Sequence, residues 1–299
     1  MEATAQKAPA KVSSRTRSEH KLAWMLCAPA VLAMLAVTAY PVGYAVVLSL
    51  QKIDLRFPEQ TEFVGLANYG TVLSSELWWT DVFNTVLIMV TSVAIELVLG
   101  MAIALVMHRA IFARGAVRTV VLIPYGIITV VAAFASDSGF VNNLPLVPDE
   151  MNWFGGHVSS LAVIVFAEVW KTTPFMALLL LAGLVTIDGG LYEAAKVDGA
   201  SAWQRFVKIT LPLMKPAILV AVLFRTLEAF RVFDSIFIMT RGAQNTESVS
   251  ILGFNQLINR LNLGLGSAVS VLIFLFVLVI AFIFVKGFGV KPEEGRPGA

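Results

Sequence analysis

Charged residues are scarce in this sequence. Asp, Glu, Lys and Arg make up 14% of its 299 residues, hydrophobic residues make up 58%, and the mean hydropathy is +0.80. A soluble domain carries about 25% charged residues, so this composition excludes an ordinary soluble domain. A helix needs roughly 20 apolar residues to cross a bilayer core. Six runs meet or approach that length: 22–50, 82–107, 120–135, 160–187, 217–240 and 267–285. The sequence therefore predicts an all-α, multi-pass protein of the cell membrane with six transmembrane helices.

Catalytic and metal-binding motifs are also missing. Cys27 is the single cysteine and lies inside the first apolar run, so no disulfide framework can form. The pattern G-x-x-x-x-G-K-[ST], which predicts a phosphate-binding loop for ATP, does not occur. No G-x-S-x-G or H-E-x-x-H pattern occurs either, and the three histidines are scattered. We therefore expect a protein that is not an enzyme and holds no metal or cofactor of its own.

The distribution of basic residues predicts the orientation in the membrane. Of the 22 Lys and Arg residues, 15 fall in segments 1–21, 108–119, 188–216 and 286–299, whereas four fall in segments 51–81, 136–159 and 241–266. Basic residues concentrate in cytoplasmic loops. Both termini and segment 188–216 are therefore predicted to be cytoplasmic. The net charge of +2 reflects this bias and does not indicate a nucleic-acid partner.

This topology divides the chain into five segments. Residues 1–21 form a cytoplasmic tail, 22–50 the first transmembrane helix, 51–81 an external loop, 82–288 the transmembrane core and 289–299 a second cytoplasmic tail. The first run could instead be a cleaved signal peptide, but its 29 residues without a charge exceed the usual apolar core of 7–15 residues. A retained helix is favoured. Residues 249–266 are expected to form an amphipathic helix on the outer surface.

The cytoplasmic segment 188–216 contains a polar, helix-prone stretch, EAAKVDGASAWQRFVKITLP, at positions 193–212. It predicts a first short helix over 191–197, which Gly199 ends in the left-handed conformation. Ser201 and Gln204 match a capping box that opens a second helix. Pro212 and Pro216 are expected to stop that second helix. The segment is thus predicted to be a helical hairpin in the cytoplasm.

One face of this hairpin is apolar. Trp203, Phe206 and Val207 recur at helical spacing, while Glu193 lies at the exposed start. An apolar ridge in water indicates a surface that binds a partner. The alternative is that the ridge packs against the chain's own transmembrane helices.

A family resemblance favours the first interpretation, in which the apolar ridge binds a partner protein. The order Glu-Ala-Ala at 193–195, Gly199, and Ile-x-Leu-Pro at 209–212 resembles the EAA loop of binding-protein-dependent ABC importer permeases. FVGLANY at 63–69 and the fuller form DGASAWQRF at 198–206 resemble the sugar-importing branch, and the whole chain is similar to its trehalose-importing members. The resemblance implies the type I importer permease fold. It also implies a disaccharide as cargo, with trehalose first.

The resemblance further implies partners. The loop would insert into a cleft of a separate ATPase subunit, which would bind the ATP and Mg²⁺. Two such ATPases, a second permease subunit and an extracytoplasmic sugar-binding protein would complete the transporter. The residues carried over as contacts with the ATPase are Glu193, Ala194, Ala195, Asp198, Gly199, Trp203, Phe206, Ile209, Leu211 and Pro212.

Seven charged residues lie inside the apolar runs, where each costs about 2.5–3.5 kcal/mol if it faces lipid. Four of them alternate in sign at i, i+3 spacing from Arg225 to Asp234, so neighbours can pair along one helix. Glu96 stands alone in its run and is expected to have a structural partner. The candidates for a polar substrate path are Asn84, Glu168, Trp170, Lys171, Arg225, Glu228, Arg231 and Asp234.

Two interpretations of these charges stay open. They can hold the helices together, or they can line a path for sugar hydroxyls. An ion-coupled secondary sugar transporter is the alternative function, because such a carrier would use the charges for proton or sodium coupling. That alternative has no use for a cytoplasmic hairpin of the EAA pattern.

Overall fold

A computed structural model of the chain describes residues 14–109 and 152–288. Helices dominate these ranges, and five stretches are long and apolar enough to cross a membrane: Trp24–Ser49, Glu76–His108, His157–Val185, Ala202–Ala229 and Leu263–Gly287. They belong to α1 (Ser14–Ser49), α3 (Glu76–Arg109), α6 (His157–Val185), α9 (Leu211–Ala229) with the turns before it, and α12 (Leu263–Phe288). The all-α prediction is confirmed. The predicted span 120–135 lies outside the described residues.

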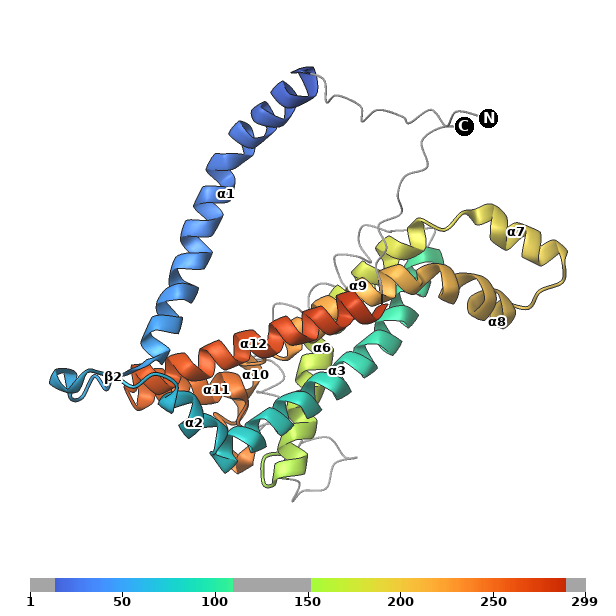
Figure 1. The fold of residues 1–299 in the computed structure, drawn as a ribbon. Helices are drawn as coiled ribbons and strands as arrows, with labels where there is room; N and C mark the ends of the chain where they lie inside the picture. The colour runs from blue at the N-terminus through green and yellow to red at the C-terminus, as the bar shows by residue number, and fades with distance from the viewer. Residues whose placement is uncertain (1–13, 110–151, 289–299) are drawn as a thin grey trace, which may run out of the picture.

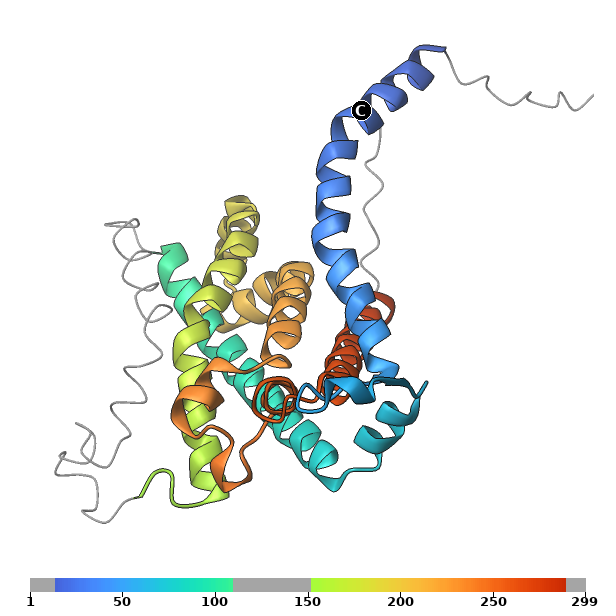
Figure 2. The same cartoon turned by 90° about the vertical axis from the view of Figure 1, so that its left-hand side faces the viewer.

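The core of the bundle is formed by α3, α6 and α9 (Figures 1 and 2). Met176 and Leu180 of α6 and Met214 of α9 are completely buried in one apolar cluster with residues of α3. Two glycines let the helices approach closely. A Cβ atom at Gly183 would lie 2.4 Å from Ala217 Cβ, and one at Gly100 would lie 2.8 Å from Met176 Cγ. The sequence thus packs three apolar helices together by placing small residues where they cross.

Helix α1 stands apart from this core. Figure 1 shows it rising away from the bundle, and no residue of its most apolar stretch is buried. It reaches the bundle at its C-terminal end, where α1 and α12 are in contact. Asn68 then secures the following segment, because its Nδ2 donates to the carbonyl oxygens of Ser49 and Gln51 at 2.8 and 2.9 Å.

The segment 51–81 between α1 and α3 contains two short strands as well as helical turns. A two-stranded antiparallel hairpin, β1 (Gln51–Lys52) and β2 (Glu62–Phe63), encloses a 3₁₀ turn at Pro58–Gln60. Helix α2 (Ala67–Leu73) follows and leads into α3.

The expected continuous helix over 217–240 is wrong. Helix α9 ends at Ala229, and a separate helix, α10 (Asp234–Met239), follows after a turn. Phe230 is buried and stacks on Phe276 of α12, with the ring centroids 5.8 Å apart. Ser248 Oγ donates to the freed carbonyl oxygen of Val232 at 2.9 Å. These tertiary contacts stabilise the break after Ala229, although the local sequence is apolar enough to continue the helix.

The segment after α10 is also more buried than expected. It consists of a 3₁₀ turn at Ala243–Asn245, α11 (Val249–Phe254) and a π turn at Asn255–Asn259. Val249, Ile251 and Leu252 are buried, so the prediction of a surface helix over 249–266 is wrong. These side chains pack into two of the apolar clusters of the core, and α11 contacts α12 and α3.

Candidate coupling hairpin and intramembrane polar site

The hairpin between α6 and α9 has the two helices and the turn that its sequence predicts. Helix α7 (Gly189–Val197) starts two residues earlier than expected, because the side chain of Asp188 caps Gly190 N. Gly199 has φ +77°, the left-handed conformation. Ser201 and Gln204 form the capping box of α8 (Ala202–Arg205), with hydrogen bonds of 3.2 and 2.7 Å.

The second arm does not stop at the prolines. It passes through a π turn at Phe206–Thr210 and continues directly into α9, which contains both Pro212 and Pro216. Proline clashes with the carbonyl group four residues before it in a regular α-helix. The wider π turn lies at that position for Pro212, and Leu211 N donates to the more distant Phe206 O. The prediction that these prolines end the helix is therefore wrong.

The apolar ridge of the hairpin is divided between solvent and core. Trp203 is 71% exposed and Val197 is 88% exposed. Phe206 packs against the main apolar cluster and contacts the Trp203 ring, with the centroids 5.7 Å apart. Figure 1 shows α7 and α8 projecting from the bundle. The base of the ridge therefore packs against the chain's own helices, whereas Trp203 at its tip is exposed.

The predicted docking residues are distributed in the same way. Phe206 and Ile209 are partly buried, as is Ala195, whereas the other seven are exposed. A hydrogen bond of 2.9 Å between Tyr192 Oη and Thr210 Oγ1 joins α7 to the π turn. Arg205 Nη1 donates to Ala200 O at 2.6 Å across the turn. The hairpin is thus braced internally, its tip is apolar, and Glu193 on α7 is also exposed.

Inside the bundle, Arg225 is the centre of a polar cluster. Its guanidinium donates to both oxygens of Glu96 on α3, at 2.6 and 2.9 Å, and to Glu228 at 2.8 Å. Arg225 and Glu96 are completely buried, while the side chain of Glu228 is 49% exposed. The structural partner expected for Glu96 is therefore Arg225. The local sequence gives no signal for this pair, because its members are 129 positions apart.

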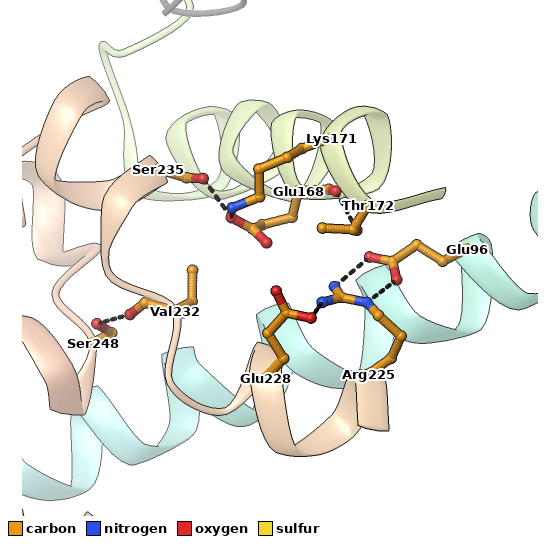
Figure 3. Close-up of polar contacts among 9 residues, drawn as sticks. All are labelled: Glu96, Glu168, Lys171, Thr172, Arg225, Glu228, Val232, Ser235 and Ser248. Atoms are coloured by element: carbon orange, nitrogen blue, oxygen red, sulfur yellow. Dashed lines mark hydrogen bonds and ion pairs between the residues drawn. The ribbon is translucent and has the colours of Figure 1, made fainter. Parts of the chain in front are cut away.

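Glu168 of α6 forms a second cluster. Lys171 Nζ donates to Glu168 Oε1 at 3.0 Å, and Ser235 of α10 donates to the same oxygen. Thr172 Oγ1 donates to the backbone oxygen of Glu168 at 2.6 Å. Figure 3 shows this cluster facing the Arg225 cluster, with the side chains of Glu168 and Glu228 directed toward the region between them. Ser235 carries no charge and had no sequence signal as a partner.

Of the ion pairs predicted between the four alternating charges from Arg225 to Asp234, which together would form a ladder along one helix, only the first is present. The pair Arg225–Glu228 is present, but α9 ends before Arg231, so the i, i+3 geometry is lost. Arg231 and Asp234 are exposed and make no ion pair within residues 14–109 and 152–288. The expectation of a continuous ladder is therefore wrong.

The two uncharged candidates lie in different settings. Trp170 is 50% exposed on α6. Asn84 is completely buried far from this site, where its Nδ2 donates to the carbonyl oxygens of Asn245 and Glu247. It therefore secures segment 245–247 and is not brought together with the other candidates.

Comparison with known proteins identifies the fold and the family. Residues 79–289 match the model of the family described as binding-protein-dependent transport system inner membrane component. The chain belongs to this family of ABC importer permeases. The permease is 53% identical to the trehalose transport system permease protein SugA of Mycobacterium tuberculosis, over 99% of both chains. It is 41% identical to the trehalose/maltose transport system permease protein MalF of Thermococcus litoralis, over 84% of this chain and 88% of that one.

A solved structure has the same fold. A bacterial ABC transporter involved in the import of the acidic polysaccharide alginate contains a chain that matches this permease with a TM-score of 0.75. The match covers 92% of this chain and 98% of that chain at 23% identity. The permease is therefore a multi-pass membrane protein with the architecture of an ABC importer subunit.

Proposed function

We propose that this permease imports a disaccharide, most directly trehalose, by alternating access driven by ATP hydrolysis on separate subunits. The observation that carries the proposal is the 53% identity to a trehalose permease over 99% of both chains. The relative in Thermococcus litoralis is named for trehalose and maltose, which are both disaccharides. Similarity over the full length supports a shared substrate class more strongly than a shared fold does.

The sugar path is proposed to run between the Glu168 and Arg225 clusters. Glu228 is half exposed and Lys171 is partly exposed, so both have polar atoms that a ligand can reach. Charged groups make strong hydrogen bonds with neutral partners such as hydroxyls. Trp170 offers an apolar surface for the face of a sugar ring, whereas Arg225 acts through the two carboxylates that it holds. The exposed Arg231 and Asp234 stay candidates at the break after α9.

The hairpin 188–216 is proposed to be the contact with an ATPase subunit. Its exposed tip offers Trp203 and Val197 to an apolar cleft and Glu193 to a basic group. The internal brace would let the tip move as a unit with α9. In this proposal the permease binds no cofactor, ATP and Mg²⁺ belong to two partner ATPases, and a second permease subunit and a sugar-binding protein complete the assembly.

The ion-coupled secondary transporter is disfavoured. Its coupling charges would be those from Arg225 to Asp234, yet Arg225 is fully engaged with Glu96 and Glu228. Membership in an ABC importer family accounts for the hairpin, which a self-contained carrier does not need.

The test is ATP hydrolysis by the assembled transporter in lipid vesicles, with its binding protein and a panel of disaccharides. We expect stimulation by trehalose and little by sucrose or lactose. Stimulation by another disaccharide would keep the importer and replace the cargo. If no ATPase co-purifies with the permease, the proposed coupling is wrong.

A further inference from the structure

A third polar cluster lies near the start of α3, about four turns before Glu96. The side chain of Asp81 is 1% exposed, and neither of its oxygens has a hydrogen-bond partner in the described parts of the chain. Asn84, one turn further along and completely buried, donates to the backbone oxygens of Asn245 and Glu247 at 2.6 and 3.1 Å. Its own Oδ1 is likewise without a partner there. The i, i+3 spacing places both side chains on the face of α3 that contacts segment 245–247.

Glu247 adds a second carboxylate. Its Oε1 accepts a hydrogen bond of 2.7 Å from Asn255 Nδ2, and its backbone oxygen accepts one of 3.1 Å from Asn84 Nδ2. Two neighbouring carboxylates, one of them deeply buried, are costly unless something neutralises them. Neither belongs to an ion pair within residues 14–109 and 152–288.

The nearby donors and cations are engaged elsewhere or do not reach these oxygens. His157 Nδ1 pairs with the backbone oxygen of Gln244 at 3.0 Å. The guanidinium of Arg241 lies over the Phe237 ring, 5.9 Å from its centroid. Trp78 Nε1, a buried donor one turn before Asp81, does not donate to it. Among the residues that the structure describes, the cluster therefore offers oxygen acceptors and negative charge without a cationic side chain to match them.

We propose that Asp81, Asn84 and Glu247 bind a hard divalent cation of the calcium type. Such cations take carboxylate, amide and backbone carbonyl oxygens, which are the groups gathered here. Two carboxylates balance two positive charges. Glu247 is only partly buried, so the cation can enter beside it. A site with two carboxylates is weak, and we expect a Kd of about 10⁻⁴–10⁻³ M, as in extracellular calcium modules. The bound cation would pin segment 245–247 to α3.

The direct test is terbium luminescence of the full-length chain in detergent. Tb³⁺ replaces calcium at oxygen sites and emits when a nearby tryptophan is excited. Trp78 lies three residues before Asp81, so it is the expected sensitiser. We expect a saturable signal that calcium displaces and that Trp78→Phe reduces at least fivefold. Absence of a saturable signal, or displacement by magnesium and calcium at equal concentrations, would overturn the proposal.

Thermal unfolding provides the second measurement, after treatment with a chelator and at constant ionic strength. Calcium at a hundredfold excess over Kd should raise the midpoint on the order of 5 °C. Glu247→Gln, at a partly exposed position that should tolerate the change, should abolish most of this rise, and Asp81→Asn should abolish all of it.

The control is Asp54→Asn. Its hydrogen bonds from Arg56 lower the pKa of Asp54 to about 2, so this partly exposed carboxylate stays ionised throughout the titration. The control should keep the full calcium response. If Glu247→Gln and Asp81→Asn also keep the full calcium response, calcium binds elsewhere and the proposal is wrong. If Asp81→Asn stabilises the chain and the parent shows no response, the carboxyl group is protonated and the proposal is wrong.

Discussion

The guanidinium of Arg225 in α9 donates two hydrogen bonds to the carboxylate of Glu96 in α3, at 2.6 and 2.9 Å, and both side chains are completely buried. The pair joins two membrane-spanning helices of the core. Two ions in such a place are tolerated only as partners, because either one alone keeps the full cost of desolvation.

Glu96→Ala should therefore destabilise the permease strongly. Removal of one partner from a buried pair costs about 3–5 kcal/mol, since it leaves an uncompensated charge. Thermal unfolding in detergent should show the loss. The double variant Glu96→Leu with Arg225→Met removes both charges and should recover most of the stability. Equal destabilisation by the single and double variants would contradict this account.

Gly183 should not tolerate a side chain. An added Cβ would lie 2.4 Å from Ala217 Cβ, so α6 and α9 would have to separate. We expect Gly183→Ala to cost about 1–3 kcal/mol in unfolding free energy. Ala217→Gly in the same chain should recover part of the loss. The matched control is Gly70→Ala in α2, where nothing lies within 4 Å of the added Cβ.

Gly199 should matter through its backbone. Its φ of +77° strains any residue with a Cβ, although no atom lies within 4 Å of the position. Gly199→Val should distort the hairpin and reduce both ATPase co-purification and sugar uptake, and Gly199→Asn should do so less, because Asn visits this conformation more readily. Gly189→Ala, in the same hairpin and with the same open space, should leave both unchanged. Normal uptake by Gly199→Val would show that the turn geometry is not needed.

Tyr192 should affect coupling more than assembly. Tyr192→Phe removes the hydrogen bond to Thr210, which contributes about 1 kcal/mol. We expect the ATPase subunits still to bind, while more ATP is hydrolysed per sugar imported. The measurement is that ratio in reconstituted vesicles. Tyr40→Phe in the exposed helix α1 is the control. An unchanged ratio would mean that the brace does not transmit motion.

Trp203 should contribute to docking. It is 71% exposed at the tip of the hairpin, and aromatic anchors dominate protein interfaces. Trp203→Ala should weaken binding of the ATPase by about 2 kcal/mol or more, measured by co-purification at graded salt and detergent concentrations. Trp24→Ala, with a similar exposure of 70% on α1, should have no effect on that binding.

The helical class, most of the membrane spans and the cytoplasmic hairpin could be predicted from the sequence alone. Long apolar runs with few charges leave a helix as the only stable way to satisfy the backbone in a bilayer, so the helical class and most spans were predictable. The hairpin was predictable for a local reason. Its glycine turn and capping box depend on residues within four positions of one another.

Contacts between residues far apart in the chain became known only from the tertiary structure. Glu96 meets Arg225 across 129 positions, and Asn84 meets Asn245 across 161. The break of α9 depends on Phe230, which stacks on Phe276 of another helix, and on Ser248, which satisfies the freed carbonyl of Val232. The apolar pattern of 217–240 does not predict these contacts, because the partner residues lie outside it. Periodicity describes one helix at a time, whereas the placement of charges inside a membrane depends on which helices face one another.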